Sequence, residues 1–136
     1  MPELATSQTR SEATTDGVRV EVRSIYVPGH SNPDEDIYFF AYVIRITNVG
    51  RRWVQLKTRH WIITDQNGNT QEVEGPGVVG SYPALDPGEA FEYSSFCPLP
   101  TPTGTMRGTF HMVDKDGRAF DAEVAEFALS EPQAYN

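Results

Sequence analysis

The sequence contains a single cysteine and no long hydrophobic run, and each absence removes a class of protein. Because Cys97 has no second cysteine to pair with, the chain forms no internal disulfide, which favours a reducing compartment. No apolar stretch approaches the roughly 20 residues that a membrane span requires, and residues 1–16 lack the apolar segment of a signal peptide. We therefore expect a cytoplasmic protein without a membrane span.

Positive charge is also scarce. The chain carries 11 Lys and Arg residues against 19 Asp and Glu residues, a formal net charge of -8. An excess of negative charge repels nucleic acid phosphates and anionic lipid headgroups. The basic residues that do cluster, Arg45, Arg51, Arg52, Lys57 and Arg59, surround one predicted hairpin, and we expect no nucleic acid partner.

No segment shows the sustained 3.6-residue period of an amphipathic helix. Apolar and polar residues instead alternate in short segments that are separated by turn signals, a pattern typical of β-strands. Seven strands are predicted, over residues 17–27, 37–48, 53–64, 70–74, 89–96, 105–113 and 119–129. This pattern predicts an all-β, immunoglobulin-like or fibronectin type III-like β-sandwich of about seven antiparallel strands. A small closed barrel is the alternative, and the lack of paired cysteines favours the fibronectin type.

A length of 136 residues fits one domain. Residues 17–129 hold the predicted strands and form that domain. Residues 1–16 are rich in Thr, Ser and Glu with almost no large apolar side chain, so they cannot offset the entropy of ordering. We expect a disordered N-terminal tail over 1–16 and a short C-terminal tail over 130–136.

One motif invites a functional interpretation, because residues 75–80 read Gly-Pro-Gly-Val-Val-Gly and match G-x-G-x-x-G. In dinucleotide-binding folds this motif leads into a helix whose N-terminus holds a pyrophosphate. Residues 81–96 do not read as a helix, and no Lys or Arg occurs between Trp61 and Met106. We expect a tight turn that uses glycine for positive φ. The alternative is that Gly75, Gly77 and Gly80 bind a pyrophosphate-containing nucleotide, with Mg²⁺ or Co²⁺ only together with that anion.

Catalytic and metal-binding patterns are weak. Cys97 has no basic neighbour in sequence, which predicts a buried, inert thiol. The loop with His30 and the acidic residues 34–36 lacks the spacing of a calcium or zinc site. The other candidate is His60 with His111 on predicted strands. His60 falls in phase with Leu56, which predicts a core-edge histidine bonded to backbone more than a metal ligand. We predict neither a catalytic residue nor a metal site; a hydrolase that uses acidic residues and a metal is the weakest alternative.

A candidate interaction face comes from strand alternation. Trp53, Lys57, Arg59 and Trp61 share one phase of the strand predicted over 53–64. Aromatic and arginine side chains dominate the energetics of protein interfaces, so this face would suit a protein partner. The alternative is a solvated outer face of the hairpin. A free strand edge would also support a homodimer.

Several tracts of the chain resemble the bacterial ApaG family. They are residues 59–65, 78–80, 87–89, 91–93 and 101–108, with Pro83, Leu85, Ser95, Phe110 and Met112. The resemblance spans about 17–129. It implies a fibronectin-type sandwich without established catalysis, linked to cobalt and magnesium resistance or efflux, and acting as a module for an unidentified protein partner. A suggested role of the glycine motif in binding pyrophosphates would fall on Gly75, Gly77 and Gly80. Pro76 and Tyr82 depart from the family pattern, and Pro76 removes one backbone N–H donor.

Overall fold

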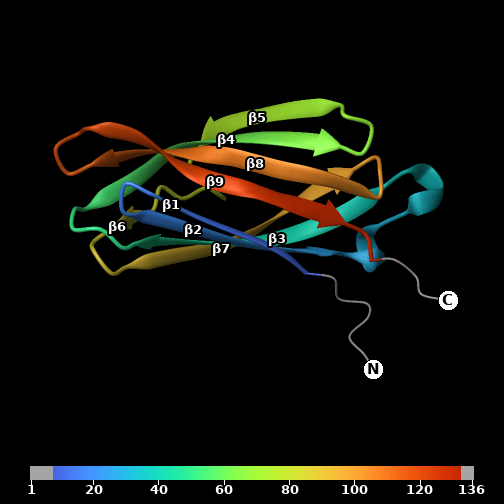
Figure 1. The fold of residues 1–136 in the computed structure, drawn as a ribbon, viewed down its shortest axis with the longest axis horizontal. Helices are drawn as coiled ribbons and strands as arrows, with labels where there is room; N and C mark the ends of the chain where they lie inside the picture. Colours follow the sequence, from blue (N-terminus) through green and yellow to red (C-terminus); the bar gives the residue numbers. More distant parts are fainter. Residues whose placement is uncertain (1–7, 133–136) are drawn as a thin grey trace, which may run out of the picture.

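The computed structural model describes residues 8–132 and shows two antiparallel sheets packed as a sandwich (Figure 1). The four-stranded sheet has the order β1 (Thr9–Thr15), β2 (Val18–Tyr26), β3 (Tyr38–Asn48) and β7 (Ala90–Leu99). The five-stranded sheet has the order β5 (Thr70–Pro76), β4 (Val54–Asp65), β8 (Thr103–Asp114) and β9 (Ala119–Ser130), and β6 (Ala84–Leu85) also pairs with β4. The predicted all-β sandwich is confirmed, with nine strands in the described residues where about seven were expected.

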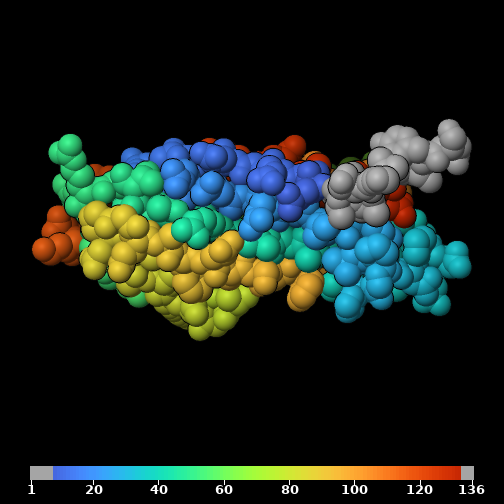
Figure 2. All heavy atoms as spheres, turned by 90° about the horizontal axis from the view of Figure 1, so that it is seen from below, coloured from blue at the N-terminus to red at the C-terminus, as the bar shows by residue number. Residues whose placement is uncertain are grey.

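The loop between β2 and β3 contains two short 3-10 turns, η2 (Pro28–His30) and η3 (Pro33–Glu35). Within residues 8–132, no helix is long and apolar enough to cross a membrane. Figure 2 shows the outer face of the four-stranded sheet, with β1 and β2 in blue, β3 in teal and β7 in gold. The yellow-green segment that follows β5 extends past β7 on this side of the molecule.

The core follows from the alternation of the strands. On β2, Val18, Val20 and Val22 are fully buried while the residues between them face outward. The same period places Ile44 and Ile46 of β3 inside. Burying side chains of this size contributes about 1.5–3 kcal/mol each. The five-stranded sheet contributes the facing side of the core with Leu56, Trp61, Met106, Phe110, Met112, Phe127 and Leu129.

The expected disordered tail was wrong for residues 9–16, because β1 pairs with β2 along its whole length. Asp16 and Gly17 both have positive φ, 48° and 82°, which suits the tight turn between two antiparallel strands. The small polar side chains of β1 bond to the other sheet, since Ser11 Oγ donates to the Ala125 carbonyl at 2.8 Å. Thr15 Oγ1 accepts the Glu123 N–H at 3.1 Å. Hydrogen bonds therefore order a segment that hydrophobic burial alone would not. Residues 1–7, and 133–136 of the predicted C-terminal tail, lie outside the described residues.

A second correction concerns the proline-rich connector. The sequence predicted that the strand from 89 ends at Phe96, but β7 continues through Pro98 to Leu99. Proline is tolerated in a strand when its missing N–H would face away from the neighbouring strand. Since β7 ends the sheet order, Pro98 lacks a donor only on the unpaired side. Pro98 therefore marks β7 as an edge strand.

A bulge in β4 reverses the phase of its alternation. Opposite β8, Leu56 pairs with Met112 and Thr58 pairs with His111, so Lys57 is the extra residue between two consecutive partners. Before the bulge the even-numbered residues face the core, as Leu56 does. After it the odd-numbered residues do, and Trp61 is buried. Every side chain of β4 after Lys57 therefore lies on the face opposite to the one that simple alternation predicts.

Candidate functional site

The glycine loop contains a two-residue hairpin. Val78 and Ser81 exchange backbone hydrogen bonds of 2.9 Å in both directions. Between them, Val79 and Gly80 have φ of 42° and 81°, the left-handed pair of a type I′ turn. Gly77 also needs to be glycine, because a Cβ there would lie 2.4 Å from the Ser81 carbonyl oxygen. The predicted use of glycine for positive φ is confirmed for Gly77 and Gly80.

Gly75 is explained by a different contact. It pairs with Arg59 in the β4–β5 ladder, and a Cβ at Gly75 would lie 2.9 Å from Nη2 of that arginine. The Arg59 side chain lies over the glycine and donates from Nη1 to the Pro76 and Gly77 carbonyls, both at 2.9 Å. The G-x-G portion of the motif therefore packs against the Arg59 side chain and accepts its hydrogen bonds.

Most of the loop's inward N–H groups are already used by the protein. The Gly77 N–H donates to the Lys57 carbonyl at 2.9 Å, and those of Val78 and Ser81 bond to each other's carbonyls. Pro76 has no N–H, and β6, not a helix, follows the loop. A pyrophosphate would therefore find neither a helix N-terminus nor a ring of free donors here. Binding through Gly75, Gly77 and Gly80 stays a prediction.

Beside this loop the sandwich is open between its two sheets. A cleft of about 290 Å³ lies between β7 on one side and β4 and β5 on the other, and we refer to it as the edge cleft. Its lining residues come from both sheets and are mainly apolar or neutral: Tyr42, Arg59, Trp61, Ile63, Gln71, Val73, Ser95, Phe96, Cys97, Pro98 and Met106. Arg59 is the single charged side chain among them.

The polar groups around the edge cleft are in a poorly hydrated setting. Burial raises the pKa of the Cys97 thiol to about 11. Burial also raises the pKa of Tyr42, an effect that a hydrogen bond with the Ser95 side chain partly offsets. The pKa of Tyr93 is raised by burial and by Tyr42, while Arg59 opposes the shift. The Tyr93 hydroxyl is buried without a hydrogen-bond partner within the described residues. Arg59, which is half-buried, is the cationic side chain next to these buried groups.

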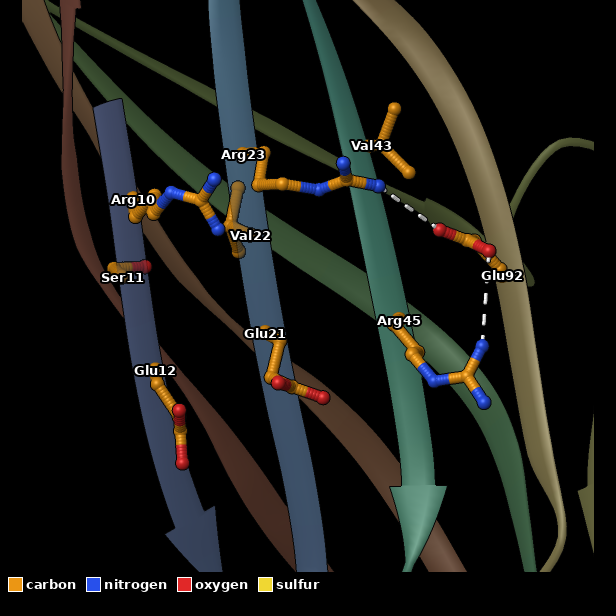
Figure 3. Close-up of a pocket in the computed structure, with 9 residues that line it drawn as sticks. All are labelled: Arg10, Ser11, Glu12, Glu21, Val22, Arg23, Val43, Arg45 and Glu92. Atoms are coloured by element: carbon orange, nitrogen blue, oxygen red, sulfur yellow. Dashed lines mark hydrogen bonds and ion pairs between the residues drawn. The ribbon is translucent and has the colours of Figure 1, made fainter. Parts of the chain in front are cut away.

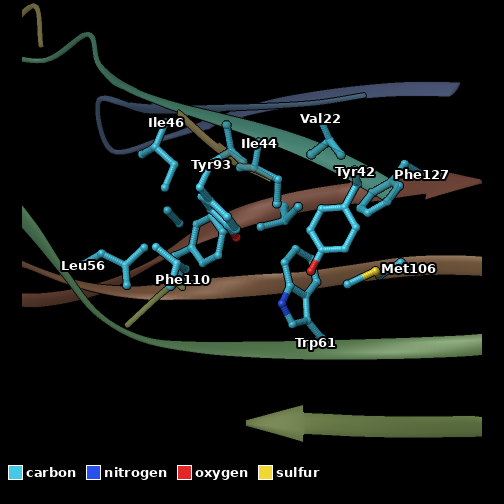
Figure 4. Packing of buried hydrophobic residues seen from close by; sticks show 14 of the residues in the cluster. Val22, Tyr42, Ile44, Ile46, Leu56, Trp61, Tyr93, Met106, Phe110 and Phe127 are labelled. Carbon is cyan, nitrogen blue, oxygen red and sulfur yellow. The ribbon is translucent and has the colours of Figure 1, made fainter. Parts of the chain in front are cut away.

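The predicted interaction face does not exist as a unit. Trp53 is half-buried and Lys57 is exposed, but Trp61 is only 3% exposed and lies in the core (Figure 4). Its ring packs edge-on against Tyr42 and Phe110, with centroids 5.8 Å away in both cases. The bulge at Lys57 is the physical reason, because it turns Trp61 inward. Of the four predicted residues, Arg59 and Trp61 meet in the edge cleft, while Trp53 and Lys57 do not line it.

The same reversal places His60 on the outer face of the five-stranded sheet, where the sequence predicted a core-edge residue. Its Nε2 lies 2.8 Å from Glu72 Oε1. His111 is also outward, with Nδ1 2.8 Å from Asp121 Oδ1, and His30 stacks on the Phe39 ring. Among residues 8–132, no three metal-ligating side chains gather at one point. Cys97 is buried, as the sequence predicted.

The outer face of the four-stranded sheet carries a larger groove, of about 420 Å³ (Figure 3). Of its three arginines, Arg23 lies 3.3 Å and Arg45 3.7 Å from Glu92, whereas Arg10 donates to the Gln8 side chain. Glu12 and Glu21 add further negative charge. The groove therefore balances its own charge, unlike the edge cleft, where in the described residues no acidic side chain forms an ion pair with Arg59.

The sequence did not indicate the edge cleft, although three of its lining residues, Arg59, Trp61 and Cys97, were considered as candidates. The missing information was that Pro98 belongs to a strand, which would have marked β7 as an edge. Tyr42, Val73 and Ser95 line the cleft and were not singled out, because strand alternation says which face a residue occupies but not which strands border a gap.

Comparisons with known proteins agree with this fold. The ApaG domain family matches residues 28–114. Protein ApaG of Methylobacterium sp. is 53% identical over 121 residues, which cover 89% of this chain and 93% of that protein. Protein ApaG of Bordetella pertussis is 54% identical over 114 residues, covering 84% of this chain and 87% of that one. A crystal structure of a B. pertussis protein described as ApaA superimposes with a TM-score of 0.83, 53% identity and coverage of 86% and 95%.

Proposed function

The chain belongs to the ApaG domain family, and on that premise we propose that it is a non-catalytic binding module that acts through a protein partner. The observation that carries the proposal is the edge cleft, where an arginine without an acidic partner in the described residues lies among apolar walls. Clefts that combine aromatic residues with arginine are typical centres of protein interfaces.

Exposed apolar side chains on the same side of the molecule support this proposal. Phe96, at the edge cleft, is 60% exposed, and Val79 and Tyr82 of the projecting loop are 56% and 47% exposed. Single exposed apolar side chains are common on protein surfaces, but several on one side of a molecule are typical of an interaction site. We therefore place the partner-binding surface on the β7 side of the sandwich.

The absence of catalysis is part of the proposal and rests on the chemistry of the candidate groups. The pKa of Cys97, at about 11, keeps this buried thiol protonated at neutral pH, so it is a poor nucleophile. His60 and His111 each bond to a carboxylate on an outer sheet face. Within the described residues neither imidazole has a serine, threonine or cysteine hydrogen-bonded to it.

Site-specific photo-crosslinking tests the proposed function. A benzophenone amino acid placed at Phe96 should give a discrete crosslinked product in cells, because this position lies at the proposed surface. The same amino acid at Thr109, on the outer face of the other sheet, is the matched control and should give none. Equal products from both positions, or none from Phe96, would refute a partner surface on the β7 side.

The link to cobalt and magnesium resistance or efflux is proposed to be indirect, through that partner. The support for this is that no group of three His, Cys, Asp or Glu side chains gathers in the described residues to hold a free ion. The alternative function is binding of a dinucleoside polyphosphate at the glycine loop, and its support is the presence of Arg59 against that loop. Calorimetric titration with and without Mg²⁺ or Co²⁺ decides it, since heat that disappears in an Arg59→Gln variant would favour the nucleotide.

A further inference from the structure

We propose that the edge cleft binds an extended peptide segment that pairs with β7 as an additional strand and places an acidic side chain against Arg59. The inference rests on the proposed function and specifies the partner's chemistry. Three features carry it: a free strand edge, a cleft that opens beside that edge, and an arginine without a counter-ion at the cleft's inner wall.

The register of β7 shows which backbone groups are free. The Asn48 N–H donates to the Glu89 carbonyl, and the Gly88 N–H donates to the Asn48 carbonyl. In an antiparallel ladder such hydrogen-bonded pairs alternate with non-bonded ones. Odd-numbered residues of β7 therefore bond to β3. The N–H and C=O groups of Glu92, Ser94 and Phe96 point away from β3, toward the free edge of the sheet. These groups form a template for one more strand.

The cleft lies where the side chains of such a strand would go. Alternate side chains of an added strand point into the gap between the sheets, level with Ser95 and Cys97 of β7. The facing wall supplies Val73 and Trp61 for an apolar side chain. A volume of about 290 Å³ falls at the lower limit of small-molecule sites, roughly 300–1,000 Å³, and suits a few side chains of a strand.

Arg59 specifies an acidic residue within that strand. Its Nη1 donates to Pro76 and Gly77, whereas Nε and Nη2 donate to no acceptor in residues 8–132. These two nitrogens form a side-on pair of donors that matches a carboxylate. Arg59 projects from the opposite sheet, and packed sheets lie about 10 Å apart. A strand on β7 therefore reaches it with an inward Glu or Asp side chain, and not with its own backbone terminus.

A second copy of this chain fits the site less well. In a β7–β7 dimer, the inward residues of the added strand would be Tyr93, Ser95 and Cys97, which offer no carboxylate for Arg59. The acidic residue on β7 is Glu92, which faces outward and binds Arg23 and Arg45. Each copy also carries a net charge of -8, so like charges oppose association. The arrangement favours a peptide of another protein.

Titration of the full ¹⁵N-labelled chain with the capped peptide Lys-Val-Thr-Glu-Thr-Val-Lys tests the proposal. Its Val, Glu and Val side chains share one face, and a peptide with Gln in place of Glu is the matched control. We expect the Glu peptide to shift the amide resonances of Glu92, Ser94 and Phe96 and to bind about tenfold more tightly than the Gln peptide, as for a hydrogen bond to a charged group. Ser94→Pro should abolish binding without disturbing β3, because that N–H faces outward, whereas Thr109→Val should change nothing.

Three results would overturn the proposal. The first is equal affinity of the Glu and Gln peptides. The second is a set of amide shifts that avoids β7 or persists in the Ser94→Pro variant. The third is a dimer of this chain in sedimentation that Ser94→Pro dissociates. The comparison of Glu with Gln is made on the unmodified chain, so it holds even where Ser94→Pro fails to fold. If neither peptide binds while crosslinking at Phe96 still captures a partner, strand addition is wrong and the proposed function stands. If crosslinking also fails, the proposed function is wrong as well.

Discussion

Replacing Gly75 by alanine should destabilise the chain when Arg59 is present and stabilise it when Arg59 is absent. The new Cβ would lie 2.9 to 3.1 Å from three atoms of the guanidinium group, Nη2, Cζ and Nη1, so the side chain must move. Movement weakens the Nη1 hydrogen bonds to Pro76 and Gly77, both 2.9 Å long. The backbone of Gly75 has no positive φ, so alanine itself is acceptable there.

The magnitude follows from two opposing contributions. Loss of one charge-assisted hydrogen bond in a half-exposed position costs about 1–2 kcal/mol. Alanine in place of glycine in a strand reduces the entropy of the unfolded chain and contributes about 0.5–1 kcal/mol of stability. Gly75→Ala should therefore lower the free energy of unfolding by about 0.5–1 kcal/mol. In an Arg59→Ala background it should raise that free energy by a similar amount, a coupling of about 1–2 kcal/mol.

Urea unfolding of the four chains, followed by Trp fluorescence, measures this cycle, because Trp61 is buried and reports on the core. The dependence of the unfolding free energy on urea concentration should stay constant among the four chains, while the midpoint urea concentration changes. Gly68→Ala is the control: Gly68 has φ of 87° and nothing within 4 Å of a Cβ, so its cost should not depend on Arg59. If Gly75→Ala changes the free energy of unfolding equally in both backgrounds, Gly75 is not required to accommodate the Arg59 side chain.

Three further predictions concern the fold and its titrating groups. Trp61→Phe should destabilise the chain by about 1–3 kcal/mol in urea unfolding, whereas Trp53→Phe should stay within about 0.5 kcal/mol, because only Trp61 is in the core; equal effects would contradict the bulge. Burial raises the pKa of Cys97 to about 11, so its contribution to stability is full below the ordinary thiol pKa and is lost as pH rises toward 11. A thiol reagent at pH 8 should therefore react only at the rate of unfolding, and rapid labelling of the native chain would contradict this. The pKa of Asp114 is lowered chiefly by its hydrogen bond from the Arg118 N–H. Its contribution to stability is therefore present above the ordinary carboxyl pKa and is lost as pH falls through the lowered pKa. In an Asp114→Asn variant, the melting temperature should fall less steeply with decreasing pH in the acid range.

Seven of the nine strands, all except β1 and β6, were readable from the sequence because they depend on local periodicity. Alternating valines on β2 identified a buried face directly, and positive φ at Gly77 and Gly80 followed from a glycine-rich turn between strands. The family resemblance rested on side chains at fixed spacings. Each of these signals is contained within a few consecutive residues, so no knowledge of pairing partners was needed.

The candidate site depended on pairings between distant segments. The bulge at Lys57 exists only relative to β8, and it moves Trp61 into the core and His60 out of it. β1 is ordered by hydrogen bonds to a strand more than 100 residues away, such as that of Ser11 to Ala125. The edge position of β7, and with it the cleft beside Arg59, follows from the order of strands in two sheets. The sequence by itself determined which residues alternate and where the chain turns; the tertiary structure decided which strand lacks a neighbour, because register and sheet order arise from long-range hydrogen bonding and packing.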